Sequence, residues 1–424
     1  MFHAVVMVAI ALTGQADAVT ADEDLKLEVL RLVRRLDSRE LADREAAEKA
    51  LLEMGPKALD LFPPVDERTP AEVKERLDRV KVVLQKQQAE AAAANSTVTL
   101  SGERMLLTDI FEAIQKQTGN SIKFEQGGPN APPVRLNVDY NDAPFWPTFD
   151  EILDRAGLAV GTYGMDRTLS IRVARGEMLP RTQTASYAGP FRFQAVRVDA
   201  GRDLRMDGSR SMSLTIEIAW EPRFRPISMQ QRMSEIQIAD ENGEPVLIAA
   251  RGAELEIPVL AEAISTELRI PLEAPPRSVQ KIARLKGSMH ALMQGKAEAF
   301  EFGDLGKADN VEKRAAGVTV ILEQVRRNRD VWEIRVITRF DDAEGALASH
   351  RNWVFDNPAK LIAPGGEEIP FHAYDSTRQM ENEVGVAYFF GIDGNLDGYK
   401  FVYETASTVL SAKFDYELKD IELP

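Results

Sequence analysis

One short segment of the sequence has the residue types and spacing of a calcium-binding loop. Asp393, Asn395 and Asp397 occupy the first, third and fifth places of the EF-hand pattern, and Glu404 occupies the twelfth. The flanking residues alternate between apolar and polar, as in strands, whereas an EF-hand needs two helices. A strand rises ~3.3 Å per residue, which would carry Glu404 roughly 20 Å beyond Gly398. We therefore expect a polar hairpin turn, and the alternative is that Asp393, Asn395 and Asp397 bind calcium together with water and backbone oxygen.

Other residues with catalytic chemistry are sparse or scattered. The chain has no cysteine and therefore no thiol nucleophile or thiolate metal site. Beyond the first 18 residues the histidines are His290, His350 and His372, whose spacing forms no metal-binding pair. No metalloprotease, serine-hydrolase, phosphate-loop or dinucleotide motif is present. We predict that the protein is not an enzyme and has no cofactor, although its many carboxylates leave a glycosidase-like acid pair as an open alternative.

The composition indicates a folded, acidic protein with several domains. A chain of 424 residues is too long for one hydrophobic core, since single cores stop growing near ~250 to 300 residues. The hydrophobic share of 44% and the charged share of 28% are ordinary for globular proteins. The net charge of −15 disfavours nucleic acid, whose binding depends on phosphate neutralisation. It favours basic or neutral partners.

The first 18 residues have the pattern of a signal peptide. An apolar run, Ala4–Leu12, is followed by a polar stretch and by Ala16-Asp17-Ala18, the small-x-small pattern of a cleavage site. At 1.5 Å per residue the run would span only ~14 Å, about half of a bilayer core, so we expect no stable membrane span. We expect an exported protein in the periplasm or outside the cell; the alternative is that an uncleaved leader anchors it.

Residues 24–94 follow a helical period. Apolar residues recur three or four positions apart in two stretches: Leu25, Val29, Leu32 and Leu36, then Val73, Leu77, Val80 and Leu84. The segments Leu36–Ser38, Arg44–Ala47 and Met54–Leu59, together with Leu51, resemble a single HEAT-like repeat. In that family, helical pairs stack into protein-binding solenoids. Because only one copy is evident, we expect a small helical hairpin domain that serves as an interaction module.

Residues 97–175 run twice through a strand followed by a helix, and two further strands end the unit. The segments Ile114–Gly119 and Glu151–Leu158 resemble the short N-terminal domain shared by secretins and TonB-dependent receptors. The resemblance covers about 75 residues. It implies a small βαβ-type α+β domain that lies in the periplasm and engages protein partners without catalytic residues.

From about residue 186 to the end, the sequence alternates like short strands and approximately repeats itself. One alternating set is Leu214, Ile216, Ile218 and Trp220, and the other is Trp332, Ile334, Val336, Thr338 and Phe340. The segment Ala299–Leu305 parallels Lys413–Ile421 in the same way. We interpret this as an internal duplication that gives two antiparallel β-sandwiches of ~110 residues each, at 186–305 and 311–424.

These patterns together predict a multidomain α+β protein made of a helical hairpin, a small α+β domain and two antiparallel β-sandwich domains. The predicted function is that of a non-enzymatic exported binding or scaffold protein of the cell envelope, with envelope or secreted proteins as partners. The alternative is a carbohydrate-binding or carbohydrate-processing protein, in which an aromatic patch would bind a glycan. Trp220 and Trp332 lie in register with apolar positions, and Trp146 lies at a helix start, so we expect all three in cores.

Overall fold

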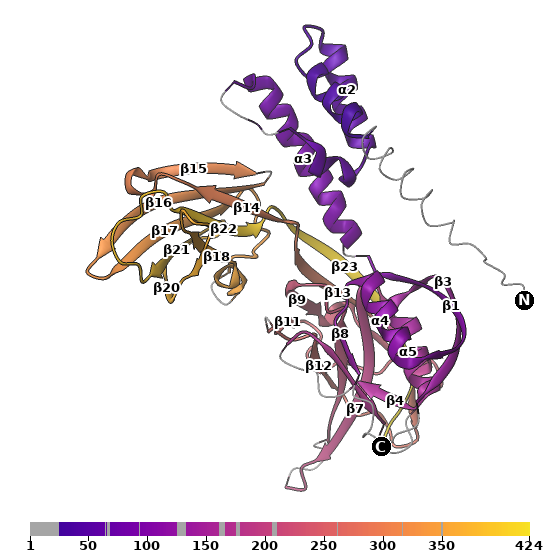
Figure 1. The fold of residues 1–424 in the computed structure, drawn as a ribbon. Helices are drawn as coiled ribbons and strands as arrows, with labels where there is room; N and C mark the ends of the chain where they lie inside the picture. Colours follow the sequence, from indigo (N-terminus) through magenta and orange to yellow (C-terminus); the bar gives the residue numbers. More distant parts are fainter. Residues whose placement is uncertain are drawn as a thin grey trace, which may run out of the picture.

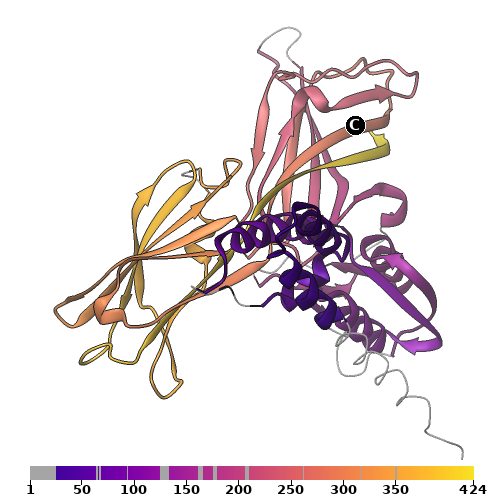
Figure 2. The ribbon, with the colours of Figure 1, turned by 90° about the horizontal axis from the view of Figure 1, so that it is seen from above.

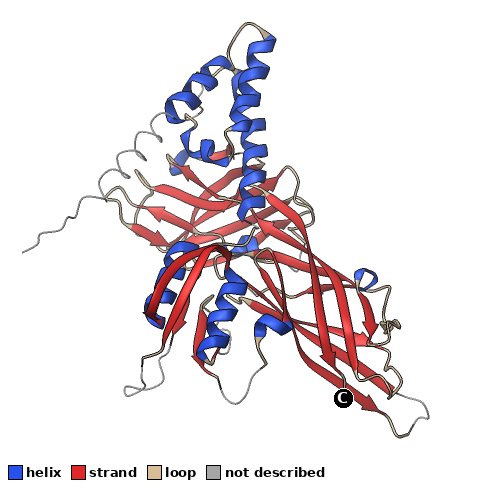
Figure 3. Cartoon of the chain, turned by 90° about the vertical axis from the view of Figure 1, so that its right-hand side faces the viewer, coloured by secondary structure: helices blue, strands red, loops and turns tan. Residues whose placement is uncertain are grey.

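The computed structural model describes residues 25–63, 65, 68–92, 94–124, 133–160, 166–174, 179–205, 210–260, 262–315, 317–348 and 351–424. The chain is a mixed α+β protein in which strands predominate and form several sheets (Figures 1 and 3). The expected signal peptide, residues 1–18, and His350 lie outside the described residues. Among the helices that the structure describes, none is both long and apolar enough to cross a membrane.

The N-terminal part is helical, as its apolar spacing predicts. Residues 25–35 form a helix, and α2 (Leu41–Glu53), the 3-10 helix η1 (Pro56–Leu61) and α3 (Ala71–Ala92) follow. The apolar residues spaced by helical turns meet in one core, which includes Val29, Leu36, Leu51, Leu77 and Leu84.

The long helix α3 is held on two sides. On one side, Arg76 donates to Glu48 of α2 at 2.7 Å, and Arg79 donates to the same carboxylate at 3.3 Å. On the other side, Gln85 Nε2 donates to Glu298 Oε1 of strand β14 (Ala297–Phe302) at 3.3 Å. Seen from above, the helices lie over the region where the sheets meet (Figure 2). α3 therefore connects the helical part to the strand-rich part of the chain.

Residues 97–173 contain two helices and two small sheets around one core. The strands are β1 (Thr97–Leu106), β2 (Ile122–Phe124), β3 (Arg135–Pro144), β4 (Leu158–Val160) and β5 (Leu169–Val173), and the helices are α4 (Leu107–Thr118) and α5 (Phe145–Ala156). β1 pairs with β3, and β5 pairs in parallel with β2 and antiparallel with β4. Each helix ends at a left-handed glycine, Gly119 (φ 72°) or Gly157 (φ 65°). Trp146 is in the core and 1% exposed, as expected.

Two sheets face each other in the next part, which we call the first sheet pair. One sheet has the order β12-β8-β7-β6; the other has the order β10-β13-β9-β11, with β23 also paired to β13. Their bounds are β6 (Ala185–Ala188), β7 (Phe191–Arg202), β8 (Arg210–Trp220), β9 (Pro226–Arg232), β10 (Gln237–Asp240), β11 (Glu254–Ile257), β12 (Ser265–Leu272), β13 (Lys281–Gln294) and β23 (Val409–Glu422). The sheets share one core. In this core, the rings of Phe193 and Tyr416 stack with centroids 4.4 Å apart.

A second sheet pair has the sheet orders β14-β22-β18-β19 and β15-β16-β17-β21-β20. The remaining bounds are β15 (Asp309–Ala315), β16 (Val318–Asn328), β17 (Val331–Phe340), β18 (Ala359–Ile362), β19 (Glu368–Pro370), β20 (Ala373–Gln379), β21 (Glu383–Phe390) and β22 (Lys400–Ala406). A single core fills the space between these sheets and includes Phe302, Val336, Tyr388 and Phe401.

The two sheet pairs exchange strands, so the units expected at 186–305 and 311–424 do not match the strand pairing. β14 lies before the expected boundary but pairs with β22 of the second sheet pair. β23 lies after it but pairs with β13 along its whole length, from Lys281–Glu422 to Gln294–Val409. Residues 297–406 are thus inserted between two neighbouring strands of the first sheet pair, and the long strands β13 and β23 run side by side (Figure 1). The alternation of apolar residues shows that each strand faces a core, but it does not show which core.

Buried charges join the 97–173 unit to the first sheet pair. Asp150 of α5 is fully buried and accepts hydrogen bonds from Arg192 Nη1 (3.0 Å) and Tyr187 Oη (2.9 Å). At a second junction, Glu221 is also fully buried and accepts from Ser96 Oγ (2.6 Å) and Asn120 Nδ2 (3.1 Å). Because buried charges require such partners, these contacts fix the position of the 97–173 unit.

Candidate functional site

A cleft of about 870 Å³ lies between the first and second sheet pairs. The first sheet pair contributes Trp220, the start of β9 and the stretch 256–260, which covers the end of β11 and the residues after it. The second sheet pair contributes the stretch 351–358 and the neighbouring ends of β14 and β22. Arg167, which lies two residues before β5, also lines the cleft. The volume is within the range of ligand-binding pockets, which is roughly 300–1,000 Å³.

Two arginines of the cleft are held by protein groups. Arg351 Nε donates to Glu256 at 2.8 Å, so an ion pair crosses from the second sheet pair to β11. Arg167 Nη2 donates to the carbonyl oxygens of Pro222 (2.7 Å) and Phe224 (2.8 Å). Burial, together with the nearby positive charge of Arg225, lowers the pKa of Arg167 to about 10. Both guanidinium groups therefore serve to hold the walls of the cleft in place.

Two acidic side chains of the cleft are exposed and close enough to repel each other. These are Glu262, from the first sheet pair, and Asp356, from the second. Partial loss of solvent raises the pKa of Asp356, and the charge of Glu262 raises it further, while Arg225 acts in the opposite direction. Neither carboxylate forms an ion pair with a residue that the structure describes. The two acids thus form a region that favours a positive charge.

The cleft also contains a buried hydroxyl that has no partner. Ser228 of β9 is 3% exposed, and its Oγ has no hydrogen bond to any described residue. Beside it, Trp220 and Trp353 are almost fully buried, and Trp353 Nε1 donates to Ala346 O at 2.9 Å. Asn357 donates from Nδ2 to both Tyr403 Oη and Thr405 Oγ1, each at 2.9 Å. These hydrogen bonds hold the lining in place, and Ser228 Oγ is an unsatisfied polar atom just beneath the surface of the cleft.

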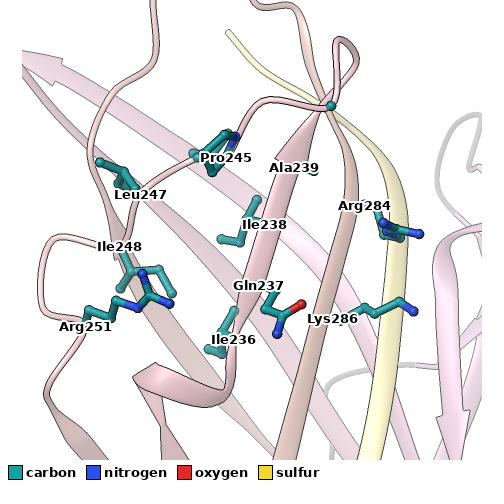
Figure 4. Close-up of a pocket in the computed structure, with 12 residues that line it drawn as sticks. Ile236, Gln237, Ile238, Ala239, Pro245, Leu247, Ile248, Arg251, Arg284 and Lys286 are labelled. Atoms are coloured by element: carbon teal, nitrogen blue, oxygen red, sulfur yellow. The ribbon is translucent and has the colours of Figure 1, made fainter.

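A smaller recess of about 350 Å³ lies on the first sheet pair, over strand β10 (Figure 4). Its apolar floor includes Ile236, Ile238 and Ile248. Figure 4 shows Arg251 on one side of β10 and Arg284 on the other. This recess is smaller than the cleft, and its charged side chains are exposed.

The calcium-like segment lies between β21 and β22, and both flanking strands are present as predicted. Asn395 Nδ2 donates to Asp397 Oδ2 at 2.5 Å, and Asp397 N is 3.3 Å from Asn395 Oδ1. The structure thus brings Asn395 and Asp397 together, while Asp393 has no hydrogen bond to either. Glu404 lies on β22 and lines the cleft, whereas the loop does not. Within the described ranges, no group of three or more His, Cys, Asp or Glu side chains is placed to hold a metal ion.

We expect calcium to leave the thermal stability of this protein unchanged. The reason is that Asn395 and Asp397 already form a hydrogen bond with each other in the turn. In addition, Glu404, the twelfth residue of the pattern, lies on β22 and outside the loop. The measurement is the melting temperature of the full chain with added calcium and with chelator. A calcium-dependent rise in Tm that Asp393→Asn and Asp397→Asn together abolish would instead establish the metal site, because a ligand that binds only the folded state stabilises it.

The described histidines lie in different sheet pairs. His290 of β13 contacts Glu235 at 2.9 Å between Nε2 and Oε2, and His372 is exposed just before β20. The sequence reasoning did not single out Ser228, Glu262 or Asp356 as site residues. They come from three distant segments, and no local motif marks them.

No family model, curated protein or solved structure matches this chain. The geometry of the cleft is therefore the basis of the functional argument.

Proposed function

We propose that this chain is a non-enzymatic, exported binding protein of the cell envelope, and that a partner protein docks in the cleft between the sheet pairs. The observation that supports this is a cleft in which Ser228 Oγ has no hydrogen bond, and Glu262 and Asp356 have no ion pair, with any residue that the structure describes. Its walls combine apolar and charged side chains, the mixture usual in protein-binding surfaces. Arg167 and Arg351 hold the walls of the cleft, so the site offers recognition groups, and we propose no bond-breaking step.

The same proposal assigns supporting roles to the N-terminal units. We propose that residues 24–94 act as a HEAT-like interaction module and that residues 97–175 act as a periplasmic domain of the secretin and TonB type. We further propose that the two sheet pairs are β-sandwiches. The buried junctions at Asp150 and Glu221 support a scaffold in which the 97–175 unit and the first sheet pair move as one body.

A glycan is the second candidate for the ligand. On β20, Tyr374 is 43% exposed and stacks on Phe355 with ring centroids 5.6 Å apart. Flat aromatic surfaces of this kind can contact the apolar faces of sugar rings. Trp220 and Trp353 also border the cleft, although both are buried. A glycan array probed with the full chain tests this candidate, and we expect no bound glycan.

Site-specific photocrosslinking tests the proposed function. Leu260 lines the cleft and is 59% exposed, so it can carry a photoreactive p-benzoylphenylalanine without loss of core packing. We expect illumination of envelope fractions to link this position to a defined protein. The matched control is the same substitution at Met380, which is 57% exposed and lies outside the cleft. Equal labelling at both positions, or none at Leu260, would contradict the proposal.

A further inference from the structure

We propose that the cleft binds an extended segment of the partner polypeptide, which adds as a strand to the free edge of β11 and places a lysine or arginine side chain between Glu262 and Asp356. This inference rests on the proposed function and names the chemistry of the partner. Three independent features of the cleft support it: a free strand edge, an excess of negative charge and an unsatisfied buried hydroxyl.

The first feature is the edge of β11. This strand pairs with β9 from Glu254–Arg232 to Ile257–Met229, and in the described part of the chain no strand pairs with its other edge. An unpaired edge presents a row of N–H and C=O groups that can pair with another chain. β11 ends at the cleft, and residues 256–260 continue along its wall. An added strand would therefore be directed into the cleft, as in known modes of peptide recognition by strand addition.

The second feature is the charge. Arg351 is paired with Glu256, whereas Arg167 is held by two neutral carbonyl oxygens and keeps its positive charge near Glu262. The lining of the cleft has four acids, Glu256, Glu262, Asp356 and Glu404, against three arginines, Arg167, Arg225 and Arg351. The chain as a whole has a net charge of −15. Both the local and the overall charge therefore favour a cationic side chain on the partner, because complementary charge increases the association rate and the specificity.

The third feature is Ser228. A buried hydroxyl without a partner costs free energy, and a polar group of the ligand that reached it would remove that cost. A small cation or a polyamine could satisfy the carboxylates, but neither would use the strand edge or supply an acceptor to Ser228. An extended polypeptide can engage all three features at once. This comparison favours a peptide over a simple cation.

Fluorescence anisotropy of the full chain with short labelled peptides tests the inference. The probes alternate threonine with lysine, with glutamine or with glutamate, and we expect the lysine peptide to bind most tightly and the glutamate peptide least. The double variant Glu262→Gln/Asp356→Asn is expected to weaken binding of the lysine peptide by about tenfold or more, the loss expected for charged hydrogen bonds. The matched control is Asp375→Asn, which neutralises an exposed carboxylate on β20 and should leave binding unchanged.

Two further probes test the strand and the hydroxyl. A lysine peptide with alternate backbone nitrogens methylated cannot donate to the edge of β11, and we expect it to bind at least about tenfold more weakly. Ser228→Ala is expected to weaken binding several-fold while leaving Tm equal or higher, because it removes an unsatisfied buried group. A merely structural role for Ser228 would instead lower Tm.

The outcomes separate this inference from the proposed function. Equal affinity of the lysine peptide for the Glu262→Gln/Asp356→Asn and Asp375→Asn variants would overturn the inference, and so would full competition by spermidine. If Leu260 still crosslinked to a protein in that case, the proposed function would stand without this peptide chemistry. Loss of the Leu260 crosslink in the Glu262→Gln/Asp356→Asn variant, with the Met380 control unchanged, would support both.

Discussion

Removal of residues 409–424 is expected to unfold the first sheet pair, although the sequence repeat assigns these residues to the second. The reason is that β23 pairs with the whole of β13 and contributes Leu410, Phe414, Tyr416 and Leu418 to the core of the first sheet pair. Burial of each such side chain contributes about 1.5–3 kcal/mol. Their combined loss is comparable with the whole stability of a typical domain, about 5–15 kcal/mol. Circular dichroism and a urea titration of the truncated chain measure the effect.

A deletion of similar design supplies the control for this truncation. Gln294 and Val409 are partners in the β13–β23 ladder, so residues 295–408 can be replaced by a two-residue Asn-Gly turn. This chain loses the second sheet pair and is far shorter, yet we expect its first sheet pair to unfold cooperatively, as in the full chain. If the truncated chain folded and the chain with the turn did not, the result would contradict the assignment of β23 to the first sheet pair.

The second large effect is expected from Arg192→Ala. This change removes the cation that faces Asp150, whose side chain has 0% of its surface exposed. It also removes the guanidinium that lies 4.9 Å from the ring of Trp146. Breaking a buried ion pair from one side typically costs about 3–5 kcal/mol, and here Asp150 would keep the hydrogen bond from Tyr187 but lose its nearest cation. We therefore expect the free energy of unfolding of the 97–173 unit with the first sheet pair to fall by about this amount.

The control for Arg192→Ala is Arg155→Ala. Arg155 pairs with Glu151 on the same helix, at 3.2 Å and with both side chains exposed. Exposed pairs of this kind contribute about 0–1 kcal/mol. Arg155 Nη2 also donates to Asn137 O of β3 at 2.6 Å, so we expect a loss that is measurable but smaller than that of Arg192→Ala. Urea unfolding followed by tryptophan fluorescence reports on both, since Trp146 lies at the junction. Equal destabilisation by the two variants would show that the Asp150–Arg192 contact does not hold the units together.

Local sequence patterns predicted the secondary structure well, because those patterns act over a few residues. The helical spacing of Val29, Leu36 and Leu77 predicted one buried face for each helix, and all three are in one core. Gly119 and Gly157 end their helices with a positive φ, a conformation that glycine adopts most easily. The alternation around Trp220 predicted a strand with this side chain inside, where it is 1% exposed.

The pairing of strands was not accessible from the same patterns. Phe300 and Phe414 stand in similar alternating segments, yet Phe300 is in the core of the second sheet pair and Phe414 is in that of the first. A period of two residues specifies that a side chain faces inward, and it carries no information on which sheet the strand joins. The duplication suggested two independent units, and the structure instead inserts one between strands of the other.

The sequence by itself determined the mixed α+β class, most helices and strands, their buried faces and the acidic charge, because each depends on local spacing or on composition. Only the tertiary structure decided the exchange of β14 and β23 and the cleft between the sheet pairs. Ser228, Glu262 and Asp356 are far apart in the chain and become neighbours in the cleft only when β9, the segment after β11 and the segment before β18 meet. Such a site depends on long-range packing, which short-range residue patterns do not encode.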